Sequence, residues 1–241
     1  MTRQARALQF RGWPSITAMA RLRAVFSSLV RSMATTNYNF GGDRVALIVR
    51  GKHSADHEPS VMAQHADCAL SKGAPVGFFG EAGGGGSSGR APSSIGASGR
   101  GSTGKSNSIG LGMAGVVYDF DKLRQNRPFY VELAQAKGYN LVSTVLFVQV
   151  TASEAKAFDD AWAGLTKSPG SFQLLGWNCS THASQAFRAS GILSGGIPGL
   201  DTPDNLYKQL CKERAGKVVS VSGYVGFARS GSGFMMTVDT P

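Results

Sequence analysis

Cysteine is scarce in this chain of 241 residues, which contains only Cys68, Cys179 and Cys211. So few cysteines, and an odd number of them, argue against a disulfide framework, because such frameworks are built from several paired cysteines. At least one thiol is therefore free unless two chains pair through it. This cysteine usage predicts synthesis in a reducing cytoplasm.

Charged residues and long apolar runs are also few. Asp, Glu, Lys and Arg make up 17% of the chain, and no run of 18 apolar residues predicts a membrane-spanning helix. Lys and Arg together number 25 and Asp and Glu 15, which gives a net charge of +10. That excess favours anionic surfaces such as nucleic acid, anionic lipid or cell-wall polymer. Because the sequence shows no nucleic-acid-binding motif, we predict no nucleic-acid partner and no stable membrane insertion.

Acidic residues are absent from residues 1–42, which contain six arginines. Arg21 and Arg23 interrupt the most apolar part of this range, so it lacks the core of a secretory signal. An Arg-rich, acid-free start is also typical of transit peptides, and that interpretation stays open. We predict that residues 1–42 form a basic leader or poorly ordered extension, and that residues 43–241 form the folded domain.

Large apolar side chains are nearly absent from residues 82–112, which are rich in Gly and Ser. Such a composition buries too little apolar area to offset its ordering entropy, so we predict a long excursion inside the domain. Residues 99–106 (GRGSTGKS) match the phosphate-loop pattern letter for letter. A phosphate loop needs a buried strand before it and a helix after it. The low-complexity context supplies neither, so nucleotide binding is not predicted.

The rest of the chain carries both strand and helix signals, which predicts an α+β fold. Order is expected to begin at Arg44. Thr151 and Glu154 have the spacing of a capping box at a helix start. Strands are predicted from apolar and β-branched runs at 45–49, 64–70, 75–80, 116–120, 141–150 and 218–238, with 64–70 and 75–80 forming an antiparallel hairpin. Helices are predicted to follow Thr151 and Asn178 and to span 204–212.

Cys179 is the candidate nucleophile. It follows Asn178 at the start of a predicted helix, where unpaired N–H groups and the helix dipole favour a thiolate. Cys68 alternates with apolar neighbours in a predicted strand and is expected to be buried, whereas Cys211 lies near the end of a basic helix. Position alone leaves a structural role for Cys179 open, because cysteine is among the residues most often buried.

A thiol nucleophile needs a base, and the chain has four histidines. His65 opens a predicted strand, where a rigid sheet can hold an imidazole against a helix N-terminus. His182 lies three residues after the thiol, but two side chains that radiate from one helix are poorly aligned for proton transfer. His53 and His57 lie in a polar loop. We therefore rank His65 first and His182 second, with a hydrogen-bonded surface histidine as the alternative for His65.

Several strings occur in an order that is similar to a known family. H-A-x-x-A-L at 65–70 is followed by G-F-F-G, then V-T-A-S-E-A, L-L-G-W-N-C-S-T-H-A-S-Q-A-F and D-T-P-D-N-L-Y. Together they resemble the circularly permuted papain-like proteins of the NlpC/P60 superfamily in its broad sense, over about residues 44–210. The resemblance implies an antiparallel sheet packed against helices, with the nucleophile at a helix N-terminus and the catalytic histidine earlier in the chain.

The same resemblance implies roles for individual residues. Cys179 is expected to be the nucleophile and His65 the general base, without a metal or organic cofactor. The family's third group is a polar residue that orients the imidazole. The expected hairpin register places Gly80 opposite His65, so Glu81 is the nearest polar candidate, and Asp67 is the alternative on the strand of His65 itself.

The implied function is a cysteine peptidase or amidase that cleaves peptidoglycan peptide and is delivered as an antibacterial effector. We expect synthesis in the cytoplasm, secretion without a classical signal peptide, action in a target-cell periplasm and an immunity protein as partner. Two alternatives stay open: the same fold acting as a thioesterase or acyltransferase or on host proteins, and a non-enzymatic binding module with a structural Cys179.

Overall fold

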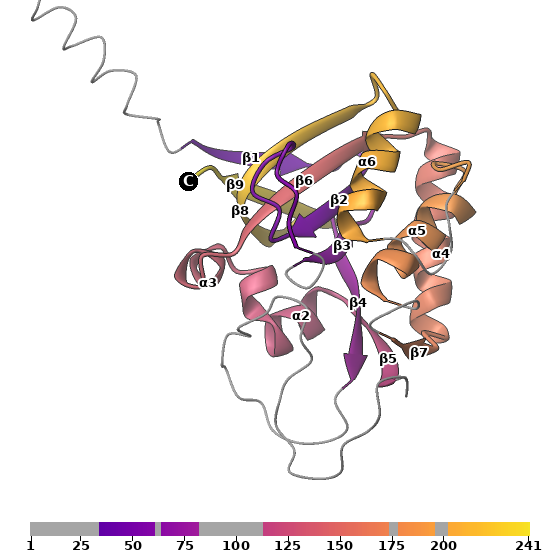
Figure 1. Ribbon diagram of the computed structural model, residues 1–241, viewed down its shortest axis with the longest axis horizontal. Coiled ribbons are helices and arrows are strands. Elements are labelled where there is room, and N and C mark those ends of the chain that lie inside the picture. The colour runs from indigo at the N-terminus through magenta and orange to yellow at the C-terminus, as the bar shows by residue number, and fades with distance from the viewer. Residues whose placement is uncertain (1–33, 61–63, 82–112, 174–177, 196–201) are drawn as a thin grey trace, which may run out of the picture. The chain divides into compact units, whose positions relative to one another are not determined.

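An antiparallel sheet of nine strands, in the order β1-β9-β8-β6-β2-β3-β4-β5-β7, organises the part of the chain that the computed structural model describes (Figure 1). That part is residues 34–60, 64–81, 113–173, 178–195 and 202–241, and the account concerns the unit Thr35–Pro241. The predicted Gly/Ser insertion at 82–112 and residues 1–33 of the predicted leader lie outside it. Five α-helices and one 3-10 helix accompany the sheet in these residues, which confirms the α+β class.

The strands and helices have the following bounds. The strands are β1 (Thr35–Asn39), β2 (Arg44–Arg50), β3 (His65–Ala69), β4 (Pro75–Glu81), β5 (Met113–Tyr118), β6 (Val142–Gln149), β7 (Ser171–Phe172), β8 (Val218–Ser230) and β9 (Gly233–Asp239). The helices are α2 (Phe120–Asn126), η2 (Pro128–Tyr130), α3 (Leu133–Gly138), α4 (Ala152–Lys167), α5 (Cys179–Ala189) and α6 (Pro203–Glu213).

Strand β2 is buried on both of its faces. Val45, Leu47 and Val49 face a core that they share with α4, α5 and α6, whereas Ala46 and Ile48 face a second core shared with α2 and η2. Figure 1 shows α4, α5 and α6 together on one side of the sheet and α2 and α3 on the other. A strand that is covered on both faces needs an unbroken apolar run, which explains V-A-L-I-V in place of an alternating pattern.

The helices begin where their capping residues predict. The capping box of Thr151 and Glu154 is present at the start of α4, with both reciprocal hydrogen bonds formed. Thr202 caps α6 through the backbone N–H of Asn205, and Pro203 occupies the first helical position. None of the helices that the structure describes is long and apolar enough to cross a membrane.

The hairpin of β3 and β4 is antiparallel as predicted, but its register differs from the predicted one by one residue. Asp67 pairs with Gly77 and Cys68 with Val76. Continued to the start of β3, this register places Phe79, and not Gly80, opposite His65. A shift of one residue moves every side chain of a strand to the other face of the sheet. The neighbours that the sequence predicted for His65 on β4 therefore change.

The sheet begins at β1, inside the range that the sequence analysis assigned to the leader. The polar strand Thr35–Asn39 pairs along β9 and lies at the edge of the sheet. Its largely exposed sequence, TTNYN, lacks an apolar alternation. This strand forms because it pairs with β9, which is about 200 residues away, and no local sequence pattern reveals that pairing.

The tip of the β8–β9 hairpin folds back against the turn between β3 and β4. The N–H of Phe234 donates to the carbonyl of Lys72 at 2.8 Å. Gly73 has a φ of +80°, and a Cβ at this position would lie 2.5 Å from the carbonyl oxygen of Phe234. Glycine is thus required here both by conformation and by close backbone approach. The contact joins β9 to the β3–β4 turn, although three strands lie between β9 and β3 in the sheet order.

Candidate active site

Cys179 is the first residue of α5, as the sequence predicts. The side-chain oxygen of Asn178 accepts hydrogen bonds from the backbone N–H of Thr181 at 3.1 Å and the hydroxyl of Ser180 at 2.7 Å. This cap sets where the helix begins, because it satisfies a donor that has no partner within the helix. The thiol therefore lies at the positive end of the α5 dipole, where negative charge is stabilised.

The thiol of Cys179 and the imidazole of His65 are hydrogen-bonded to each other. Burial alone would lower the pKa of His65, but the negative charges of Cys179 and Asp67 outweigh it and raise that pKa to about 9. Burial alone would raise the pKa of Cys179, but the charge and hydrogen bond of His65 lower it. The backbone N–H of Ala66 also donates to the Cys179 sulfur at 3.4 Å. The favoured state is a thiolate beside an imidazolium.

Asp67 supplies the carboxylate that contacts the His65 ring. His65 Nε2 and Asp67 Oδ1 are 2.8 Å apart, and Asp67 is fully buried. The two residues alternate with Ala66 on β3, so their side chains leave the same face of the strand. Because Nε2 faces Asp67, Nδ1 is the ring nitrogen left for Cys179. Gly77 makes room for this carboxylate, since a Cβ there would lie 2.2 Å from Asp67 Oδ1.

Glu81, the first candidate for the third role from the sequence, is placed elsewhere. It is the last residue of β4, is exposed, and pairs with Ala114 of β5 in the ladder. The observed hairpin register explains the difference. It places Phe79 opposite His65, so that Glu81 lies beyond the start of β3. The alternative candidate, Asp67, is the residue that the structure brings to the imidazole.

Arg50 extends the buried polar chain by one more residue. Its Nε donates to Asp67 Oδ2 at 2.8 Å, and both side chains are fully buried. Its Nη2 donates to the carbonyl of Tyr130 at 2.9 Å, and its guanidinium lies over the Tyr130 ring. Burial alone would raise the pKa of Asp67, but His65 and Arg50 lower it. Asp67 therefore stays ionised between two cationic partners.

Replacing Arg50 with methionine is expected to lower the free energy of unfolding by about 3–5 kcal/mol, because it leaves the Asp67 carboxylate buried without its arginine. Chemical denaturation of the two proteins measures the difference. Arg124→Met is the matched control, since Arg124 pairs with Glu132 at an exposed position where ion pairs contribute little. Adding Asp67→Asn to Arg50→Met should recover part of the loss. A cost for Arg50→Met no larger than that of the control would contradict the role of Arg50.

Two aromatic rings enclose the imidazole of His65. The ring of Phe79 is stacked on it at 4.5 Å between centroids, and the ring of Tyr130 at 5.5 Å. Both rings are buried, as is His65 with 5% of its surface exposed. Apolar rings around an ion pair exclude water and strengthen its electrostatic interaction. They also fix the plane of the imidazole, which keeps the nitrogens aligned with their two partners.

The other three histidines lie in different surroundings. His182 points away from the thiol: its Nε2 bonds to the carbonyl of Pro169 at 3.0 Å, and its ring is stacked on Phe78. Burial lowers the pKa of His182. His53 and His57 stack on each other, with His57 Nδ1 accepting from the backbone N–H of His53. Of the four histidines, the structure pairs His65 with Cys179.

The D-T-P-D-N-L-Y string holds α6 against the loop after β2. Lys52 is fully buried, and its ammonium donates to Asp204 Oδ1 at 2.7 Å and to the carbonyl of His57. Lys52 also lies over the ring of Tyr207. The backbone N–H of Asp204 donates to Gln64, the residue just before His65. These contacts give the string a structural role in supporting the start of β3.

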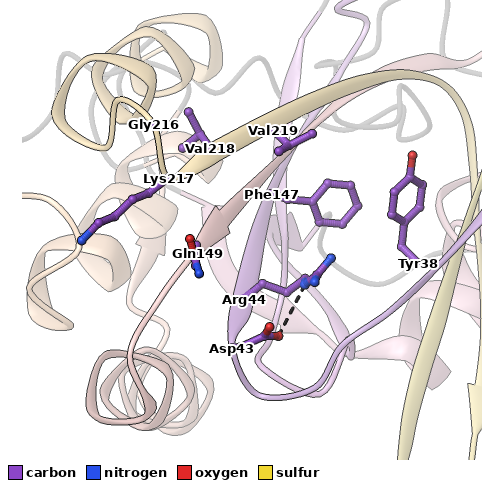
Figure 2. Close-up of a pocket in the computed structure, with 9 residues that line it drawn as sticks. All are labelled: Tyr38, Asp43, Arg44, Phe147, Gln149, Gly216, Lys217, Val218 and Val219. Atoms are coloured by element: carbon purple, nitrogen blue, oxygen red, sulfur yellow. Dashed lines mark hydrogen bonds and ion pairs between the residues drawn. The ribbon is translucent and has the colours of Figure 1, made fainter.

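A pocket formed by described residues lies away from this site (Figure 2). Its volume is about 230 Å³, and the rings of Tyr38 and Phe147, with centroids 4.6 Å apart, pack against each other in its lining. Arg44, at the first position of β2, also lines it. The opposite end of β2 carries Arg50, and seven strand residues span about 20 Å. No cysteine or histidine lines this pocket, so it offers no thiol–imidazole pair.

The groups that could hold a metal ion are also limited. Within the described ranges, no cluster of three or more His, Cys, Asp or Glu residues has the arrangement of a metal site. The phosphate-loop match at 99–106 lies outside those ranges, as does Asp201, the alternative cap of α6. The site contains a thiol, an imidazole, a carboxylate and a guanidinium, each in contact with the next.

Three residues of the site were missed by the sequence analysis. Arg50 carried a signal, because it ends a fully apolar strand run and a charge at that position needs a buried partner. Tyr130 and Phe79 carried none, since nothing in their local patterns predicts contact with His65. Against known proteins, no family model, no curated protein and no solved structure matches this chain.

Proposed function

We propose that this chain is a cysteine hydrolase with a catalytic triad of Cys179, His65 and Asp67. The observation that carries the proposal is geometric: the Cys179 thiol lies at the N-terminus of α5 and is hydrogen-bonded to His65, and the Asp67 carboxylate contacts the other nitrogen of that imidazole at 2.8 Å. Arg50 acts as a positioning residue through Asp67. A structural cysteine would need none of these partners, since burial among apolar side chains suffices for it, as at Cys68.

In the first half of the reaction, the Cys179 thiolate attacks the carbonyl carbon of the substrate amide. As the tetrahedral intermediate collapses, the carbon–nitrogen bond breaks and the His65 imidazolium gives its proton to the departing amine. The backbone N–H of Cys179 has no partner within the helix because it belongs to the first turn. It is therefore placed to donate to the oxyanion.

In the second half, neutral His65 removes a proton from water, and the resulting hydroxide attacks the thioester carbonyl. The carbon–sulfur bond breaks, which releases the carboxylic acid and returns the electron pair to Cys179. Asp67 holds the imidazole in the same tautomer through both halves and stabilises its charged form. The cycle needs water but neither a metal ion nor an organic cofactor.

The fold proposed for this site is the circularly permuted papain-like arrangement. The order along the chain supports it: the histidine strand β3 precedes the cysteine helix α5. We further propose peptidoglycan peptide as the substrate and delivery to a target-cell periplasm as an antibacterial effector. The net charge of +10 suits an anionic cell wall.

The test combines digestion of purified peptidoglycan with alkylation by iodoacetamide. We expect the protein to release peptide fragments with new amino and carboxyl ends, and one equivalent of reagent to stop the release. Peptide mass mapping should place the label on Cys179, because burial raises the pKa of the other two thiols, Cys68 and Cys211.

Two outcomes would count against this proposal. A Cys179 that resists alkylation in the folded protein at neutral pH would favour the structural role. Labelling at Cys179 together with turnover of thioesters or lipid esters, and none of peptides, would favour an acyltransferase or thioesterase.

A further inference from the structure

Four cationic side chains lie over aromatic rings in the described part of the chain, and one of them differs from the rest. Arg50 pairs with Asp67, Lys52 with Asp204, and Arg229 with Asp121. The fourth, Arg127, lies 4.7 Å above the centroid of the Phe79 ring. It forms no ion pair with any carboxylate that the structure describes.

Arg127 is held in place by its backbone at the junction of α2 and η2. Its N–H donates to the carbonyl of Leu123 at 2.7 Å, and its own carbonyl accepts from the N–H of Tyr130 at 2.9 Å. The backbone of Arg127 is thus fixed by the turn, and stacking on Phe79 is the contact that positions its guanidinium. Its side chain is half-buried, so it is accessible from solvent.

The position of Arg127 relates it directly to the candidate triad. The Phe79 ring beneath it is the same ring that stacks on His65 at 4.5 Å. The guanidinium and the proposed general base therefore contact the same aromatic ring. The charge of Arg127 also lowers the pKa of the neighbouring Tyr130, against the larger effect of burial.

The chemistry of a ring-stacked guanidinium suits one class of ligand. Stacking occupies the face of the group, whereas its five N–H donors lie in its plane and point outward. A planar fork of donors matches a carboxylate, which it binds through two parallel hydrogen bonds. An arginine with this exposure, in contact with a ring that stacks on the proposed general base, is placed to recognise an acidic substrate.

We propose that Arg127 is a specificity-determining residue that binds a carboxylate of the substrate beside the scissile amide. The substrate class is then an acidic peptide. This inference rests on the proposed hydrolase function. It adds that the site selects substrates with a negative charge. Glu81 lies two residues beyond Phe79 on the same strand face, and it does not pair with Arg127 in the structure.

The test compares native muropeptides with the same muropeptides after carbodiimide amidation of their carboxyl groups. For the unmodified full chain, amidation is expected to lower kcat/KM by about tenfold to a hundredfold, which is the range for one charge-assisted hydrogen-bonded contact. On native muropeptides, Arg127→Gln should lower kcat/KM by the same factor. On amidated muropeptides, Arg127→Gln should have the same kcat/KM as the unmodified chain. Arg127→Lys keeps the charge and should retain part of the preference.

Arg124→Gln is the control, because Arg124 lies on α2 three residues earlier and pairs with Glu132 on the surface. It should discriminate between the two substrates as the unmodified chain does. If Arg127→Gln lowers kcat/KM equally for native and amidated muropeptides, or leaves both unchanged, the proposed specificity role is wrong.

A binding measurement separates this inference from the hydrolase proposal. Titration calorimetry with the Cys179→Ala chain reports affinity for native and amidated muropeptides without turnover. Preference for the native form that Arg127→Gln removes would support the carboxylate contact even if no hydrolysis occurs. If the unmodified chain hydrolyses native and amidated muropeptides equally well, the hydrolase proposal stands and the proposed role of Arg127 is wrong.

Discussion

Replacement of Cys179 with alanine is expected to abolish peptidoglycan hydrolysis, with a loss of at least about 10⁴-fold in kcat/KM. The thiolate is the only group in the proposed mechanism that bonds to the substrate, and alanine leaves no nucleophile behind. The His65 pair and the N-terminus of α5 would remain, but neither can form an acyl-enzyme. Release of peptide fragments from purified peptidoglycan, followed by mass spectrometry, measures the effect.

Cys211→Ala is the matched control for this prediction. Cys211 lies near the end of α6, is partly buried and has a pKa above its ordinary value, so its loss should leave activity unchanged. Thermal unfolding of both variants should resemble that of the unmodified chain. A Cys179→Ala protein that keeps activity within about tenfold would refute covalent catalysis by this residue.

Replacement of His65 with glutamine is expected to lower kcat/KM by about 10³-fold or more, because it removes both the counter-ion of the thiolate and the acid–base group. In the unmodified chain, Cys179 has a lowered pKa and His65 a pKa of about 9. Thiolate and imidazolium therefore coexist from the lowered pKa of Cys179 up to about pH 9. Activity should rise with pH as the thiol ionises and fall above about pH 9 as His65 loses its proton.

The pH dependence of alkylation tests the charge pairing apart from turnover. In the unmodified chain, Cys179 should be alkylated at pH values well below about 8.5, where an ordinary thiol ionises. In His65→Gln the onset should move above that range, because burial then acts without the compensating cation. His182→Gln is the control, since His182 bonds to Pro169. An unchanged alkylation profile in His65→Gln would mean that another group lowers the pKa of Cys179.

Local patterns in the sequence were sufficient for much of the fold. The Thr151 capping box, the Asn178 cap and Thr202 with Pro203 mark helix starts through contacts within four residues. The run at 45–49 and the hairpin after His65 were likewise visible as apolar or turn patterns. Strand β1, helices α2 and α3, and strand β7 were not predicted, since they are short or largely polar and are stabilised by pairing or packing with distant residues.

For Cys179, the sequence by itself determined the chemistry of its position: a thiol at the start of a helix with an asparagine cap. It also favoured His65 as the partner. Only the tertiary structure decided that Asp67, and not Glu81, contacts the imidazole, and that Arg50 supports Asp67 from β2. The reason is physical: Asp67 leaves the same face of β3 as His65, two residues away, whereas the observed register places Phe79 opposite His65 and Glu81 beyond the start of β3. The charged chain from Arg50 to Cys179 joins two adjacent strands to a helix more than a hundred residues away, and no local pattern records that contact.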